Sequence, residues 1–214
     1  MIHPPRARAV VVLTAMFALV VGACSAGASS VPTIGPSTAP TTAGGTCPTS
    51  QPAPLAAGET RTVVITTSKG AITLKIEADL SPIAAGNFVA LASCGYYNGV
   101  VFHRVVPGFV IQGGDPTGTG SGGPGYTIQD EPVTTTYHRG TLAMARSSAP
   151  NSQGSQFFIV LADGAAQSLA SYNTYAIFGE VTAGMDAVDA IAAAADAELP
   201  SQPIKMDTVT VSNP

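Results

Sequence analysis

The chain has 214 residues, of which only 10% are charged, and a formal net charge of −4 at pH 7. It contains no run of Lys or Arg and no basic stripe, which argues against nucleic acid as a partner. Its length would allow one or two domains. Hydrophobic residues make up 45% of the chain, which is enough for one substantial core.

The first 23 residues have the pattern of an export signal. Arg6 and Arg8 lie in a basic start without acidic residues, and the apolar run VVVLTAMFALVVGAC follows them. This run is shorter than the roughly 20 apolar residues that a spanning helix needs. We therefore expect residues 1–23 to be a signal peptide, and an uncleaved N-terminal anchor is the alternative.

The segment VGAC, residues 21–24, resembles the lipobox of bacterial lipoproteins, in which an aliphatic residue and two small residues precede a cysteine. The resemblance implies that Cys24 is lipidated and becomes the mature N-terminus. The exported protein would then be anchored to the outer face of the cell membrane, since several acyl chains on one residue bind a bilayer more strongly than one myristoyl chain.

Residues 24–57 are rich in Ser, Thr, Ala, Gly and Pro and contain no charge and no hydrophobic periodicity. Such a composition predicts a flexible linker, and the folded domain is expected over residues 58–214. If Cys24 is lipidated, Cys47 and Cys94 remain as a candidate disulfide in an oxidising compartment. The alternative is that Cys94 is a buried free thiol and that Cys47 has no partner.

Alternating apolar residues begin the domain. The runs 63–67 and 72–76 flank Ser68-Lys69-Gly70 and predict a β-hairpin. A helix is predicted next, with Ser81 as its N-cap and Gly95 as its stop signal.

The rest of the domain contains short strand candidates and one further helix candidate. The strand candidates lie within the segments 100–106, 109–114, 140–145, 155–161, 174–181 and 204–211, and the helix is predicted over 182–195. Roughly eight short strands and two helices predict a mainly β fold, a closed eight-stranded antiparallel β-barrel capped by two α-helices. Closure of the barrel would also remove exposed strand edges.

Several common chemistries lack support in the sequence. Gly118, Gly120 and Gly123 match G-x-G-x-x-G, but Pro124 and Gly125 follow, so no helix N-terminus could receive a pyrophosphate. A flexible surface loop is the better interpretation. The histidines and cysteines lack metal-ligand spacing and no G-x-S-x-G elbow is present, so we expect no metal, no cofactor and no serine hydrolase.

Arg104 lies among apolar residues and glycines, without a nucleophile or a carboxylate pair beside it in sequence. Strand alternation places Phe102 and Arg104 on one face, and Val110 and Gln112 on one face after the turn. The side chains that could surround a small apolar ring are Arg104, Gln112, Gln156, Phe109, Val110 and Phe158. The alternative is that the apolar members are core residues and that Arg104 is a surface charge.

Three segments closely resemble the cyclophilin family of peptidyl-prolyl cis-trans isomerases. They are FHRVVPGFVIQGGD at 102–115, GTLAMARSSAPNSQGSQFFI at 140–159 and YAIFGEV at 175–181, and the resemblance extends from about Arg61 to the C-terminus. It implies an eight-stranded barrel with two helices, a proline-binding groove on its outer face, and isomerase activity on X-Pro bonds.

The resemblance also implies roles for individual residues. Arg104 matches the family's catalytic arginine, and Gln112 would orient it. The substrate-binding residues implied are Phe109, Val110, Gln112, Ala145, Arg146, Gln156, Phe158, Leu169 and Tyr175. Ser168 stands where many members have tryptophan or phenylalanine, a position linked to the inhibitor cyclosporin, so cyclosporin is expected to bind weakly.

Other departures from the family pattern surround the same groove. Val110 stands where methionine is common, Arg146 where asparagine is common, and Tyr175 where many members have histidine. The segment 167–175 is two residues longer than is usual in the family. None of these departures affects the arginine.

We therefore expect a lipid-anchored, monomeric isomerase that acts on proline-containing polypeptides and assists the folding of exported proteins outside the cytoplasm. The alternative is a non-catalytic chaperone module that binds proline peptides on the same fold. A third hypothesis, a structural lipoprotein with a relic barrel, predicts a decayed pocket, which the sequence does not show.

Overall fold

The computed structural model describes residues 45–212. The predicted signal peptide, Cys24 and residues 24–44 of the predicted linker lie outside the described residues. No helix within residues 45–212 is long and apolar enough to cross a membrane.

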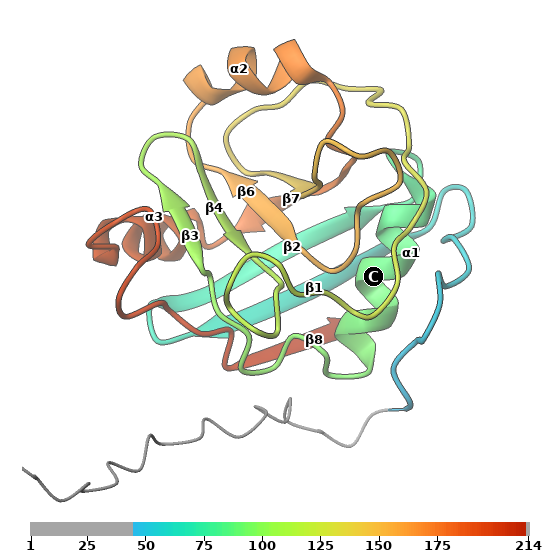
Figure 1. Cartoon of the computed structure of the whole chain (residues 1–214), viewed down its shortest axis with the longest axis horizontal. Coiled ribbons are helices and arrows are strands. Elements are labelled where there is room, and N and C mark those ends of the chain that lie inside the picture. The colour runs from blue at the N-terminus through green and yellow to red at the C-terminus, as the bar shows by residue number, and fades with distance from the viewer. Residues whose placement is uncertain (1–44, 213–214) are drawn as a thin grey trace, which may run out of the picture. The chain divides into compact units, whose positions relative to one another are not determined.

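The described chain forms eight antiparallel strands, curled into a half-barrel, and three helices (Figure 1). The strands are β1 (Thr60–Thr67), β2 (Gly70–Glu77), β3 (Arg104–Val106), β4 (Val110–Gly113), β5 (Thr141–Met144), β6 (Phe157–Val160), β7 (Ile177–Ala183) and β8 (Thr208–Ser212). The helices are α1 (Pro82–Ser93), α2 (Gly164–Tyr172) and α3 (Met185–Ala194).

The half-barrel is open, so the expected closed barrel is wrong. The strand order is β3-β4-β6-β5-β7-β2-β1-β8, and the end strands β3 and β8 do not pair with each other. The segment 198–206 lies between them and makes separate hydrogen bonds, from Phe102 N to Ile204 O at 2.9 Å and from Gly99 N to Met206 O at 2.7 Å. Pro200 and Pro203 lack an N–H group, which prevents a continuous ladder in this segment.

The structure contains three helices within the described residues, where the sequence predicted two. The predicted helices correspond to α1 and α3, and α2 was missed. Only Ala165 and Leu169 of α2 are buried, so its nine residues carry too short an apolar stripe for a periodic signal. Its N-cap residue, Asp163, makes no side-chain hydrogen bond to the helix, and its Oδ1 instead accepts from Arg139 N at 2.7 Å.

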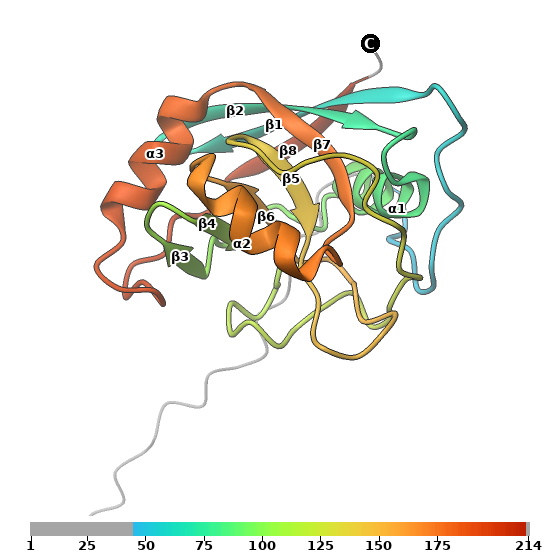
Figure 2. The same cartoon turned by 90° about the horizontal axis from the view of Figure 1, so that it is seen from above.

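The main core fills the inside of the curled sheet, with an aromatic cluster at its centre. The Phe88 ring of α1 lies 5.1 to 5.2 Å from the rings of Tyr97, Phe157 and Phe178. Helices α1 and α3 lie at opposite ends of the half-barrel (Figure 2). Both helices therefore cover apolar side chains that an open sheet would leave in water.

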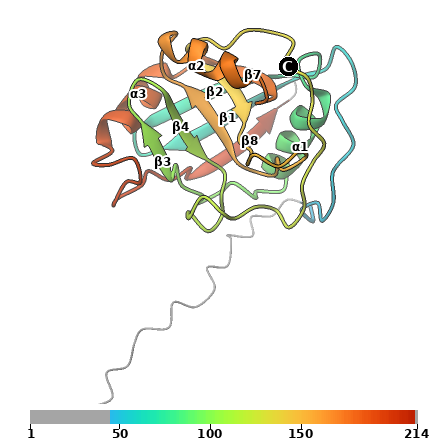
Figure 3. The same cartoon turned by 45° about the horizontal axis from the view of Figure 1, so that its top comes forward.

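A second apolar cluster lies on the outer surface of the sheet, beneath α2. It contains Val110 of β4, Ala143 of β5, Phe158 of β6 and Ile177 of β7, together with Leu169 of α2. Figures 2 and 3 show α2 against this side of the sheet, beside β4 and β6. This outer cluster supplies the floor of the pocket described below.

Residues 45–57, the end of the predicted linker, contact the domain. Cys47 forms a disulfide with Cys94, the C-cap residue of α1, with 5.2 Å between their Cα atoms. Leu55 packs against the main core, and its N–H donates to Pro82 O at 3.1 Å. A Cβ atom at Gly86 would lie 2.4 Å from Ala53 O, so only glycine allows this segment to approach α1 so closely.

Candidate active site

A pocket of about 430 Å³ opens on the outer surface of the sheet. Its lining residues come from β3, β4, β6, α2 and the segments beside them, and they are Arg104, Phe109, Val110, Gln112, Ala145, Arg146, Phe158, Leu169, Tyr172 and Tyr175. Nine of the ten catalytic and substrate-binding residues predicted from the sequence therefore line one pocket. The tenth, Gln156, lines the pocket beside it.

The floor of this pocket is apolar because adjacent strands turn the same face outward. Val110, Phe158 and Leu169 are almost fully buried there. Gln112 is paired with Phe158 across β4 and β6, so their side chains lie on one face. The prediction that Phe102 shares a face with Arg104 is wrong, since Phe102 precedes β3 and is buried in the main core.

An aromatic row extends from the floor to the surface. The Phe158 and Tyr175 rings meet edge to face at 5.4 Å, and the Tyr175 and Tyr172 rings follow at 6.4 Å. Tyr172 is 68% exposed, and sequence reasoning did not place it in the site. It lies at the end of α2, outside the three segments that carried the family resemblance.

Arg104 begins β3, and its side chain is directed by an acidic residue far along the chain. Its Nε donates to Glu198 Oε1 at 2.7 Å, which forms an ion pair. The implied partner Gln112 instead donates from Nε2 to Gln156 Oε1 at 2.9 Å, although Arg104 and Gln112 are paired across β3 and β4. Sequence reasoning missed Glu198, because no local pattern links residues 94 positions apart.

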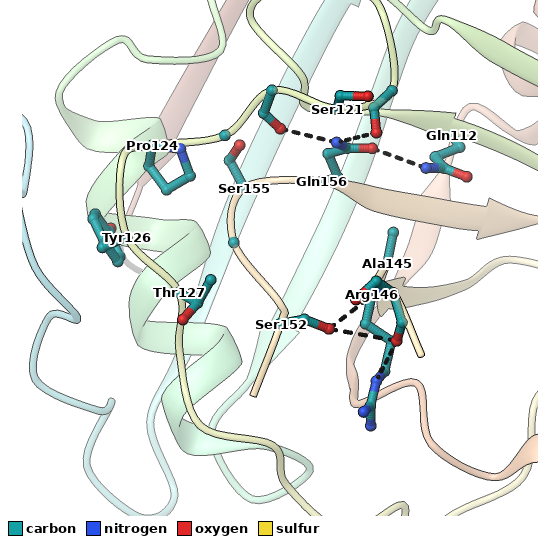
Figure 4. Close-up of a pocket in the computed structure, with 15 residues that line it drawn as sticks. Gln112, Ser121, Pro124, Tyr126, Thr127, Ala145, Arg146, Ser152, Ser155 and Gln156 are labelled. Carbon is teal, nitrogen blue, oxygen red and sulfur yellow. Dashed lines mark hydrogen bonds between the residues drawn. The ribbon is translucent and has the colours of Figure 1, made fainter. Parts of the chain in front are cut away.

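A second pocket, of about 450 Å³, adjoins the first and shares Gln112, Ala145 and Arg146 with it (Figure 4). Gln156 connects the two pockets, since its Nε2 donates to Gly120 O and to Gly122 O, each at 2.9 Å. The lining of the second pocket is mostly polar and glycine-rich. An extended peptide could thus place an apolar ring over the first pocket and a neighbouring residue over the second.

Comparisons with known proteins decide the family. Residues 62–211 match the family model described as cyclophilin type peptidyl-prolyl cis-trans isomerase/CLD. The chain belongs to the cyclophilin family of peptidyl-prolyl cis-trans isomerases. This cyclophilin is 40% identical over 161 residues to peptidyl-prolyl cis-trans isomerase-like 3 of Dictyostelium discoideum, a match that covers 72% of this chain and 97% of the relative.

Other relatives give the same result. Peptidyl-prolyl cis-trans isomerase CYP18-1 of Arabidopsis thaliana is also 40% identical over 161 residues, covering 72% of this chain and 98% of the relative. A crystal structure of a Cryptosporidium parvum cyclophilin type isomerase matches with a TM-score of 0.65 and 35% identity, covering 72% of this chain and 99% of that one. A second structure of that protein was determined in the presence of the dipeptide Ala-Pro.

Arg146 of this cyclophilin is held on the side of both pockets. Its Nη1 lies 3.1 Å from Asp130 Oδ2, and its Nη2 donates to Ala149 O at 2.8 Å.

Within residues 45–212, no group of three or more His, Cys, Asp or Glu side chains could hold a metal ion.

The glycine loop of this cyclophilin, residues 117–125, is organised by Asp115, which is fully buried. Its Oδ2 accepts from Gly120 N at 2.7 Å and from Gly122 N at 3.0 Å, and its Oδ1 accepts from Thr117 N at 2.7 Å. A Cβ atom at Gly122 would lie 2.0 Å from Asp115 Oδ1, so only glycine fits there. The amides of a formal dinucleotide motif are thus directed at a carboxylate of the same chain.

We expect acid to weaken this loop. Burial alone would raise the pKa of the Asp115 carboxyl, but hydrogen bonds from Thr117, Gly122 and Gly120 outweigh it and lower the pKa from 3.8 to about 2. A carboxyl whose pKa is lower in the folded than in the unfolded chain stabilises the fold at pH values above its unfolded-state pKa. This contribution, of about 1–2 kcal/mol, is lost as pH falls through about 2. Urea unfolding between pH 5 and pH 2 measures it.

The matched variants for this measurement are Asp115→Asn and Asp207→Asn, the second at an exposed position. Asp115→Asn should be less stable than the wild type at pH 5, and the difference should shrink toward pH 2. Asp207→Asn should follow the wild-type pH dependence. If Asp115→Asn keeps the full wild-type pH dependence, another carboxyl causes it.

Proposed function

We propose that the pocket around Arg104 binds the proline ring of an X-Pro peptide and that Arg104 catalyses its cis-trans isomerisation. The observation that carries the proposal is that Arg104 lines the same pocket as a buried apolar floor of Val110, Phe158 and Leu169. An apolar floor suits a ring of methylene groups. The structure of the similar Cryptosporidium parvum isomerase determined in the presence of Ala-Pro supports a proline ligand.

The reaction needs no nucleophile and moves no proton. Rotation about an X-Pro bond faces a barrier of roughly 18–20 kcal/mol and takes tens to hundreds of seconds unaided. At the transition state the amide is twisted, and the proline nitrogen regains a lone pair that can accept a hydrogen bond. A guanidinium over this nitrogen stabilises the twisted state more than the planar one, which is the condition for catalysis.

Arg104 suits this role because a guanidinium stays protonated at any working pH. A charge-assisted hydrogen bond contributes roughly 1.5–3 kcal/mol, or about one to two orders of magnitude in rate. The remaining acceleration would come from the apolar floor, which fixes the ring, and from desolvation. The planar amide is the more dipolar form and loses more on leaving water.

The bonded pair Gln112 and Gln156 would serve the peptide on either side of the proline. Both Nε2 hydrogens of Gln156 are donated to carbonyl oxygens of the glycine loop, which holds the side chain rigid. Backbone groups next to Ala145 complete this wall, since Ala145 N donates to Gln156 O at 2.9 Å. An extended peptide would lie along this fixed wall and across both pockets, as the family resemblance implies.

We propose further that the protein is exported and anchored through a lipid on Cys24. The basic and apolar start and the lipobox-like VGAC support this proposal. The Cys47–Cys94 disulfide supports an oxidising compartment. In that location a monomeric isomerase, tethered by a linker, would assist the folding of exported polypeptides. Cell fractionation of Cys24→Ser should show its loss from the membrane, and retention there would contradict lipidation.

A proline-isomerisation assay on the mature chain tests the activity against the non-catalytic chaperone alternative. The enzyme should accelerate the exchange of an Ala-Pro peptide at catalytic concentration. A chaperone module would bind the same peptide in a titration without accelerating its exchange. Binding without acceleration would therefore favour the alternative.

We also expect weak cyclosporin binding. Ser168 lies exposed on α2, beside the buried Leu169 of the pocket floor, where many cyclophilins have an aromatic residue. Ser168→Trp should therefore lower the cyclosporin concentration that halves activity, with peptide turnover little changed. Ser171→Trp, on the same helix, is the matched control. Strong inhibition of the wild type would contradict the expectation.

A further inference from the structure

The side chain of Arg104 has one hydrogen-bonding partner among residues 45–212, and that partner is Glu198. The bond runs from Arg104 Nε to Glu198 Oε1 at 2.7 Å, between side chains that are 34% and 58% exposed. A guanidinium has five N–H donors in a fixed plane. A bond at Nε therefore fixes the plane and leaves the four Nη hydrogens for a ligand.

Glu198 is itself held against β3. Its backbone oxygen accepts from Val105 N at 2.8 Å, so Glu198 bonds to two consecutive residues of this strand, once by main chain and once by side chain. The loop after it is tied by Asp196, whose Oδ1 accepts from Ser201 N at 2.9 Å. Pro200 further limits the freedom of the loop. The backbone of Glu198 is thus held beside β3 before any substrate arrives, with its carboxylate in reach of Arg104 Nε.

Within the described residues, 45–212, no other acceptor bonds the Arg104 side chain. Gln112, which is paired with Arg104 in the sheet, donates an Nε2 hydrogen to Gln156 Oε1 and belongs to the wall between the two pockets. A long arginine side chain with no bond at Nε would sample several rotamers, and each would place the Nη groups differently. A small misplacement of a catalytic group costs much of its effect.

We propose that Glu198 is a positioning residue, which aims the guanidinium of Arg104 into the pocket by accepting its Nε–H. This inference rests on the proposed function of Arg104. The role depends on the acceptor oxygen and its position, and only weakly on the negative charge, because an exposed ion pair contributes little Coulomb energy. Glutamine at 198 keeps such an oxygen, whereas alanine does not.

The test uses the full mature chain with Glu198→Ala and Glu198→Gln. Glu198→Ala should lower kcat about three- to tenfold with KM changed less than about twofold. Glu198→Gln should keep most of the wild-type kcat. Asp189→Asn is the matched control, because Asp189 forms a 2.7 Å pair with Arg139 that lies outside the pocket. It should leave kcat and KM unchanged.

A spectroscopic readout separates positioning from a general loss of structure. The Nε–Hε resonance of Arg104, assigned by its absence in Arg104→Lys, should move in Glu198→Ala and stay near its wild-type position in Glu198→Gln. In an Arg104→Ala background, Glu198→Ala should cause no further loss of kcat. An equal loss in both backgrounds would show that Glu198 acts independently of Arg104 and would overturn the proposal.

Three outcomes separate a failure of the positioning role from a failure of the proposed function. If Arg104→Ala is impaired while Glu198→Ala matches the wild type, only the positioning role fails. A rise in kcat in Glu198→Ala would also overturn it, because the carboxylate would then restrain the guanidinium. If Arg104→Ala itself turns over normally, the proposed function fails first.

Discussion

Arg104→Ala should lower kcat for isomerisation about 10- to 100-fold, while a proline peptide still binds measurably. The guanidinium is proposed to bond the proline nitrogen only in the twisted state, so its loss affects the transition state more than the bound ground state. The pocket floor of Val110, Phe158 and Leu169 remains in the variant and should still hold the ring. The isomerisation assay gives kcat, and a peptide titration gives Kd.

Two arginine variants serve as controls for this result. Arg104→Lys keeps the charge but lacks the planar fork and the Nε–H that bonds Glu198, so its turnover should lie between wild type and alanine. Arg139→Ala removes an arginine whose ion pair lies outside the pocket and should leave turnover unchanged. Near-normal turnover of Arg104→Ala would refute the assignment of Arg104.

Removal of the disulfide should lower the free energy of unfolding by about 4 kcal/mol in the chain-entropy model. The bond joins residues 47 positions apart, so the unfolded chain loses much freedom when it is closed. It also holds residues 45–57 beside α1, where Leu55 packs on the core. Urea unfolding of Cys47→Ala/Cys94→Ala, compared with the oxidised and the reduced wild type, measures the effect.

Activity separates this effect from damage to the site. Neither cysteine lines the pocket around Arg104, so the double variant should keep its wild-type kcat under conditions where it is folded. The reduced wild type should unfold at nearly the same urea concentration as the double variant. A stability loss below about 1 kcal/mol would show that contacts such as Leu55 on the core hold the segment without the disulfide.

Elements with strong local signals were predicted well. The β1–β2 hairpin has alternating apolar residues and a turn that places Thr67 opposite Gly70, which has a φ of 124°. Helix α1 begins at Pro82 after Ser81, and Gly95 follows its end with a φ of 80°. Each of these signals lies within a few residues of the feature that it predicts, which is why sequence reasoning could find them.

Helix α2 and the opening of the barrel were not predicted, and both depend on distant contacts. Helix α2 is short and exposes most of its surface, and it is stabilised by packing Leu169 over Phe158 and Ile177 on the sheet. Whether the half-barrel closes depends on how the segment 198–206 meets the strand β3. Neither the segment 198–206 nor β3 has a hydrophobic periodicity that would predict their contact.

Nine of the ten residues that line the pocket could be named from the sequence, through the cyclophilin resemblance and, for Val110, Gln112 and Phe158, through strand alternation as well, but Tyr172 could not. The pairing of the polar groups in and around the pocket became visible only in the folded chain. Glu198 bonds Arg104, Gln112 bonds Gln156, and Asp115 gathers the amides of the glycine loop. The physical reason is that a hydrogen bond depends on distances of about 3 Å between atoms that folding brings together, and sequence spacing does not encode such distances.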